Sequence, residues 1–167
     1  MDRRNLLTGL SLAGVAVAAL ENSSADAQDR GATRSLIERF ASTLSAHDID
    51  GFAALFADGY VNHQVSAAAP PPAAGVTPKQ GTVRFFAGRL KGMPDLKVAI
   101  EASVANGDTA AASFVYEGTQ SGDYLGVAPT GRRLRFTSCD IFRVVDGKIV
   151  EHWGMGDIAG VMAQLKS

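Results

Sequence analysis

Near its C-terminus the chain contains a sequence that strongly favours a β-hairpin. The dipeptide Asp146-Gly147 separates two apolar runs, Val-Val and Ile-Val, and glycine readily supplies the positive φ that a tight hairpin turn requires. A two-residue type I′ loop would set Asp140 opposite Trp153. A three-residue loop with a bulge would instead set Asp140 opposite His152. The hairpin therefore predicts two long paired strands, and the sequence is compatible with both registers.

The periodicity of the apolar residues changes once along the chain. Helical spacing predicts a helix around residues 36–44, Asp48 caps a short second helix, and the capping-box sequence at 77–80 opens a third. Strands are expected at residues 60–65, 96–104, 109–118, 132–144 and 148–153. A final helix is expected at residues 158–165. Helices followed by an antiparallel sheet are typical of an α+β domain.

The first 27 residues have the pattern of an export signal. Arg3 and Arg4 precede a mostly apolar run over residues 6–20, and residues 25–27 form an Ala-x-Ala cleavage pattern. The paired arginines resemble a twin-arginine signal, and ordinary secretion also fits the segment. The apolar run is shorter than the ~20 residues that span a bilayer, so no stable membrane anchor is expected. These features predict an exported, periplasmic protein in which residues 28–167 form a single domain.

The charge of the mature part is balanced. Of the 16 basic and 17 acidic residues in the whole chain, 14 of each remain once residues 1–27 are removed. A neutral domain lacks the basic footprint that nucleic acids or anionic membranes require. The single cysteine, Cys139, leaves no partner for an intramolecular disulfide. We therefore expect no nucleic-acid partner.

Asp140 is the residue whose placement most suggests chemistry. Strand alternation puts it on one face with Phe136 and Phe142. Burying a carboxylate without a partner costs several kcal/mol or raises the pKa of the group, and such a carboxylate can take a proton from carbon next to a carbonyl. His152 would then donate a hydrogen bond to the enolate oxygen or shuttle the proton. Alternatively, Asp140 and His152 only satisfy one another as a buried polar pair.

Several motifs together resemble the SnoaL-like polyketide cyclases, or predicted ester cyclases, of the nuclear transport factor 2-like superfamily. They include Gly-x-x-x-Gly-x-x-Pro-Thr-Gly-Arg ending at Arg132, Asp-Ile-Phe-Arg-Val from Asp140, and Glu-His-Trp around His152, and the similarity covers nearly all of residues 33–166. The resemblance implies a cone-shaped, curved antiparallel sheet packed against N-terminal helices, acting on a small molecule without a cofactor. It also implies that positions 140 and 152 both line the pocket, which favours the bulged register.

The resemblance also implies an oligomer and reveals one departure from the family pattern. Superfamily members often pair through the outer sheet face, so a homodimer is expected, with Ile141, Arg143 and Trp153 at the interface. In characterised cyclases the acid/base is an aspartate two residues after the histidine, and here that position is Gly154. Asp140 stands where those cyclases carry a pocket histidine, so an exchange of roles would make Asp140 the base.

Further residues are candidates for binding the substrate. Tyr60 and Asn62 share one strand face and His63 lies on the other, so only one face can look into the pocket. Tyr124 could close the pocket mouth, and Phe136 and Phe142 would exclude water. Asp157 is a further nearby acid, although capping the terminal helix explains it better.

A metal site would require His63 to join His152 and Asp140, since two histidines and a carboxylate are a set that holds iron or zinc. No short ligand spacing supports such a site. No metal is therefore expected.

Two kinds of function fit these observations. The first is an enzyme that enolises or cyclises a small carbonyl or ester compound with Asp140 as base and His152 as partner. Lyase or isomerase chemistry would leave the same pattern of residues. The second is a non-catalytic protein that binds a small molecule on the same scaffold, with Gly154 marking lost catalysis.

Overall fold

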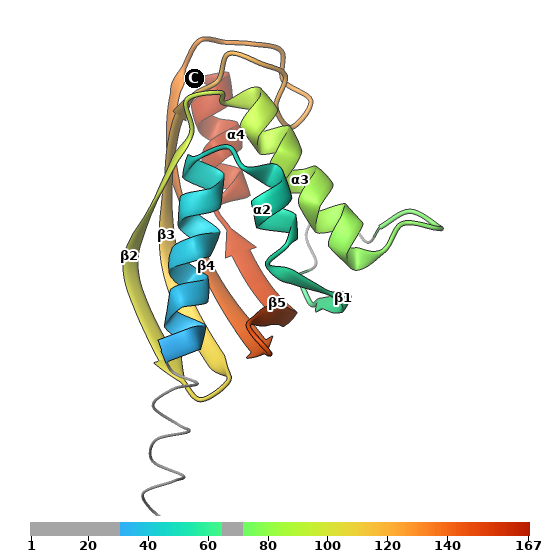
Figure 1. Cartoon of the computed structure of the whole chain (residues 1–167). Coiled ribbons are helices and arrows are strands. Elements are labelled where there is room, and N and C mark those ends of the chain that lie inside the picture. Colours follow the sequence, from blue (N-terminus) through green and yellow to red (C-terminus); the bar gives the residue numbers. More distant parts are fainter. Residues whose placement is uncertain (1–30, 65–71) are drawn as a thin grey trace, which may run out of the picture.

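The computed structural model describes residues 31–64 and 72–167 (Figure 1). The export signal predicted for residues 1–27 lies outside the described residues, as do residues 65–71 of the Pro/Ala-rich segment that follows the first strand. Within the described ranges, no helix has both the length and the apolar character needed to cross a bilayer.

Three of the four helices begin where the sequence predicts them to begin, and the first is longer than the predicted 36–44. A first helix covers residues 31–45, α2 spans Ile49–Ala53, α3 spans Pro78–Gly92 and α4 spans Ile158–Lys166. Asp48 and Asp157 cap α2 and α4 by accepting a hydrogen bond from a backbone N–H in the first turn. Thr77 and Gln80 form a complete capping box at the start of α3.

Five strands form one curved sheet with the order β1-β5-β4-β3-β2. Their bounds are β1 Phe56–Asn62, β2 Lys97–Asn106, β3 Thr109–Thr119, β4 Arg133–Val145 and β5 Lys148–Gly156. The pairs β2/β3, β3/β4 and β4/β5 are antiparallel, but β1 pairs parallel to β5. The expected fully antiparallel sheet is wrong at this edge. Strands joined directly by short turns must run antiparallel, whereas β1 and β5 are far apart in the chain.

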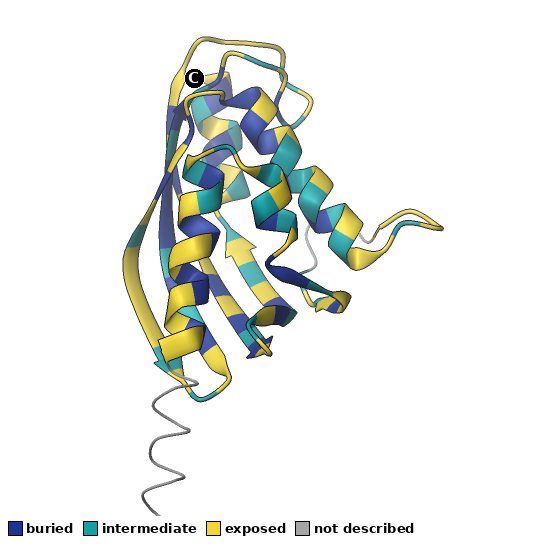
Figure 2. Cartoon of the chain, in the orientation of Figure 1, coloured by how far each residue is buried: buried dark blue, intermediate teal, exposed yellow. Residues whose placement is uncertain are grey.

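The helices cover one face of the sheet, which we call the inner face (Figure 1). The first helix turns its buried side toward the sheet and its exposed side to solvent (Figure 2). Aromatic rings join the layers, with the Phe40 ring centroid 5.0 to 5.6 Å from those of Phe52, Phe86, Phe114 and Phe142. This α+β architecture confirms the predicted fold class.

The hairpin register matches the two-residue loop at the turn, but the partner of Asp140 differs from both expectations. Asp146 and Gly147 have φ of 50° and 69°, which is typical of a two-residue type I′ turn, and Val144 pairs with Ile149. A bulge at Val150 then shifts the strands by one residue, so that Asp140 pairs with Gly154. The three-residue loop was therefore wrong, because the extra residue lies within β5 rather than in the turn.

Candidate functional site

A buried network of polar side chains lies on the inner face, where β1, β5 and β4 adjoin α3. Asp140 is 5% exposed and His152 is 2% exposed. Although the two residues are not directly opposite, they share a face, and His152 Nε2 lies 2.8 Å from Asp140 Oδ1. Ser138, two residues before Asp140 on the same face, donates its hydroxyl proton to Asp140 Oδ2 over 2.5 Å. Both carboxylate oxygens therefore accept a hydrogen bond from a neighbouring side chain.

The network continues from His152 to the edge strand and to α3. The Tyr60 hydroxyl lies 3.1 Å from His152 Nδ1 and accepts a hydrogen bond from Thr82 Oγ1 at 3.4 Å. Asn62 Nδ2 donates to Thr82 Oγ1 at 3.4 Å. A hydroxyl that accepts from Thr82 has its own proton to give to Nδ1, which assigns the imidazole proton to Nε2. Donation then runs in one direction, toward Asp140.

Gly154 provides the space that the Asp140–His152 pair occupies. A Cβ at position 154 would lie 2.6 Å from Asp140 Oδ1 and 2.7 Å from His152 Nε2, closer than real Cβ contacts come. Phe142 covers the imidazole, with ring centroids 5.1 Å apart and planes 10° apart. The glycine, the carboxylate and the imidazole are therefore one packing unit, and a side chain at 154 would displace the other two.

The family model of SnoaL-like polyketide cyclases matches residues 34–165. The chain belongs to this family. It shares the nuclear transport factor 2-like fold. Among solved structures, IdmH from Streptomyces antibioticus, a proposed polyketide cyclase, is 28% identical, with a TM-score of 0.69 and coverage of 81% of this chain and 99% of IdmH.

Two further solved structures show the same likeness. AclR from Streptomyces galilaeus, a proposed hydroxylase, is 25% identical with a TM-score of 0.69, covering 82% of this chain and 97% of AclR. TsrD from Streptomyces laurentii is 26% identical with a TM-score of 0.69, covering 82% of this chain and 96% of TsrD. No curated protein matches the chain. Because a cyclase and a hydroxylase are both proposed on this scaffold, the likeness shows the family and leaves the reaction open.

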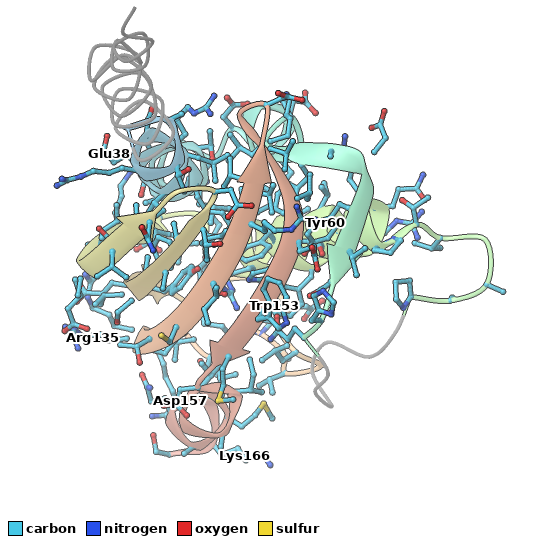
Figure 3. The ribbon with its side chains drawn as sticks, turned by 90° about the horizontal axis from the view of Figure 1, so that it is seen from below. Glu38, Tyr60, Arg135, Trp153, Asp157 and Lys166 are labelled. Carbon is cyan, nitrogen blue, oxygen red and sulfur yellow. The ribbon has the colours of Figure 1, made fainter. Side chains whose placement is uncertain are left out.

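The predicted site residues on β1 divide between the two faces of the sheet. Tyr60 is buried in the inner-face network, whereas His63 follows β1 on the outer side. Of the two alternatives that the sequence left open, the face of Tyr60 is therefore the one that looks inward. The His63 ring stacks on Trp153 at 4.4 Å, and its Nε2 lies 2.8 Å from Glu151 Oε2. Hydrogen bonds from His63 and then from Arg143 hold the pKa of Glu151 below its ordinary value. Trp153 lies on β5 next to β1 (Figure 3), and the His63, His152 and Asp140 set does not form.

The remaining candidates are distributed along the inner face and the end of the sheet. Phe136 is buried and stacks on Tyr116 with centroids 5.1 Å apart. Tyr124 is buried, and its hydroxyl accepts a hydrogen bond from Arg89 Nε at 3.1 Å. Asp157 lies where β5 passes into α4 (Figure 3) and caps that helix. Asp157 makes no contact with the network, so no contact supports its expected place in the substrate site.

Sequence reasoning did not select Ser138 and Tyr116 on the inner face of the sheet, or Thr82 and Arg89 on the helix that covers it. Ser138 could have been found, since strand alternation already groups it with Asp140. Thr82 and Arg89 lie on α3, and helical spacing alone does not reveal which strand residues they meet.

A separate open groove of about 520 Å³ lies where α2, β1 and α3 meet. Asp58 and Lys79, both lining residues, pair at 2.9 Å. None of the network residues lines this groove.

Alkaline pH is expected to destabilise the protein through its buried tyrosines. Burial raises the pKa of Tyr60 and of Tyr116 well above the ordinary value of about 10. The folded state therefore keeps protons that the unfolded state loses, so their stabilisation is complete below pH about 10 and declines above it. Each tyrosine should lower the free energy of unfolding by up to about 1.4 kcal/mol per pH unit.

Urea unfolding from pH 8 to pH 11.5 would measure this decline. Tyr60→Phe should remove about half of the decline above pH 10 and should also lower stability at pH 8, because His152 Nδ1 loses its donor. If the free energy of unfolding fell equally steeply with pH in the variant and the parent protein, Tyr60 would not be a source of the decline.

Proposed function

We propose that the protein is a cofactor-independent SnoaL-like cyclase that enolises a small carbonyl or ester compound, with Asp140 as base. The observation that carries the proposal is the buried Asp140–His152 pair beside Gly154. It supports a role in proton transfer because a carboxylate, an imidazole and a tyrosine hydroxyl are connected without a break.

The cross-strand geometry supports the exchange of roles between positions 140 and 154. The two residues are direct partners in the β4/β5 ladder, and the space of a side chain at 154 is taken by the Asp140 carboxylate. A carboxylate can therefore reach the same part of the inner face from either strand. With glycine at 154, the family's missing acid/base has a substitute that approaches from β4.

The proposed step is a proton transfer. Asp140 takes a proton from the carbon next to the carbonyl, the C–H electron pair forms the enolate, and the enolate carbon attacks a second carbonyl of the same molecule to close a ring. His152 holds Asp140 Oδ1 through Nε2–H and can relay the proton, while Tyr60 fixes the tautomer. The proton then returns to the alkoxide of the closed ring or to a leaving alcohol.

The first half of this step can be tested without knowing the natural substrate. Proton NMR in D₂O would follow deuterium entry at the α-carbon of a panel of β-keto esters and 1,3-diketones. If β-keto esters or 1,3-diketones bind, we expect at least one compound of each class that binds to exchange its α-proton faster with the protein than in buffer alone. Saturable binding with no acceleration of exchange would contradict the proposal and favour a binding protein.

A non-catalytic binding protein is the second candidate, and one observation favours it. Within the described ranges, every fully buried side-chain nitrogen and oxygen has a hydrogen-bond partner. The network is therefore self-satisfied, as a purely structural cluster would be.

We also propose that the protein forms a homodimer through the outer face of β4 and β5. Exposed apolar side chains gather there, with Ile141 paired to Trp153 and Met155, 78% exposed, paired to Cys139. Met155→Asp would place a charge in this interface. We expect sedimentation velocity to show a dimer for the parent protein and a shift toward monomer for the variant. A dimer equally stable in both would contradict this choice of interface.

A further inference from the structure

Arg89 is a buried cation enclosed by aromatic rings. It lies in the last turn of α3 and is 4% exposed. Its Cζ atom is 4.6 Å from the ring centroid of Tyr116, 4.9 Å from those of Phe85 and Phe86, and 5.1 Å from that of Phe136. Aromatic faces attract a guanidinium, but they carry no net negative charge. The positive charge therefore remains uncompensated by these contacts.

The described residues supply Arg89 with no carboxylate. Its only side-chain hydrogen bond within residues 31–64 and 72–167 runs from Nε to the Tyr124 hydroxyl, and it takes part in no ion pair there. The Nη groups, which carry most of the five N–H donors of an arginine, have no partner among these residues. Since no fully enclosed polar side-chain atom in this part of the chain lacks a partner, the unpartnered Nη atoms keep some contact with solvent.

Arg89 and Asp140 lie near the same tyrosine. Burial raises the pKa of Tyr116, and within that environment the charge of Arg89 acts to lower it while the charge of Asp140 acts to raise it. Both charges are therefore within electrostatic range of one hydroxyl on the inner face. The hydrogen bond to Tyr124 accounts for only one of the N–H groups of Arg89, because it uses Nε alone.

We propose that the Nη groups of Arg89 bind a carboxylate on the substrate. The guanidinium fork matches a carboxylate in a bidentate manner. Arg89 is the only lysine or arginine among the buried described residues, so the site offers one positive charge, which balances a monoanion better than a phosphate dianion. The substrate is then an oxo acid or its half ester, with a carboxylate at Arg89 and an enolisable carbon facing Asp140. Only this last placement rests on the proposed function.

Binding of charged and uncharged probes of one shape would test the proposal. Calorimetry would compare acetate and benzoate with acetamide and benzamide on the whole mature protein. We expect at least one carboxylate to bind tenfold or more tightly than its amide, and Arg89→Met to remove that preference. Arg84→Met, which changes an exposed arginine on the same helix, should leave it intact.

Three outcomes would overturn the inference: equal affinity for carboxylate and amide, no saturable carboxylate binding, or an undiminished preference in Arg89→Met. If Arg89→Met does not fold, Arg89→Lys and the Nε–H resonance of Arg89 in the parent protein give the answer, since bound carboxylate should shift that resonance. Asp140→Asn removes a negative charge that acts on the same tyrosine as Arg89, so it should bind carboxylates at least as tightly as the parent protein does. Carboxylate binding without α-proton exchange would therefore refute the proposed function and leave this inference standing.

Discussion

Asp140→Asn is expected to slow α-proton exchange by about 10²- to 10⁴-fold, the contribution typical of a positioned general base. Asparagine keeps the size of the side chain, and its carbonyl oxygen can still accept the Nε2–H of His152, which is 2.8 Å from Oδ1 in the parent protein. What it loses is the ability to take a proton. Deuterium incorporation measured by NMR on the same compounds would give the ratio of rates.

Asp157→Asn is the matched control for this change. It also converts an aspartate to asparagine, but at the cap of α4, where either residue serves. Asp157→Asn should promote α-proton exchange of the test compounds at the same rate as the parent protein. Equal rates for Asp140→Asn and the parent protein would remove Asp140 from the mechanism.

Gly154→Ala is expected to lower the free energy of unfolding by about 1–3 kcal/mol, the usual cost of overpacking a buried site. The added Cβ would lie within 2.6 to 2.8 Å of the Asp140 carboxylate and the His152 ring, so one of these side chains must move. Exchange activity should fall as well, because the network is disrupted. Urea unfolding at pH 7 would measure the stability change.

Gly156→Ala provides the comparison on the same strand. A Cβ there would meet nothing closer than 3.9 Å, so we expect stability within about 0.5 kcal/mol of the parent protein, as for mutations that touch no special feature. Equal effects at positions 154 and 156 would show that Asp140 and His152 do not need the space at Gly154.

Local signals predicted most of the secondary structure. Asp48, Thr77 and Asp157 cap helices as expected, because a cap depends only on the residues of one turn. Alternation along β4 likewise placed Asp140 with Phe136 and Phe142 on the buried face. It depends only on strand geometry.

Features set by contacts between distant segments were not predicted. The bulge at Val150 lies where β5 runs between β4 and β1, and the hairpin sequence contains no information about the pairing with β1. The choice of Tyr60 over His63 for the inner face was also left open, since β1 is an edge strand with polar residues on both sides. The ring cage of Arg89 draws on α3, β3 and β4 at once, so no single segment carries a signal for it.

The most direct test moves the carboxylate from β4 to β5 and measures α-proton exchange. With Asp140→Ala alone, the α-proton of the test compound should exchange no faster than in buffer. The double variant Asp140→Ala/Gly154→Asp returns a carboxylate to the space that the Asp140 side chain vacates, because the two positions are ladder partners. The His152 ring must still shift, since its Nε2 would lie 2.7 Å from the new Cβ. We predict that it recovers at least about a tenfold gain over Asp140→Ala, a fraction of what a general base contributes. Parent-like exchange in Asp140→Ala, or no gain in the double variant, would contradict the account.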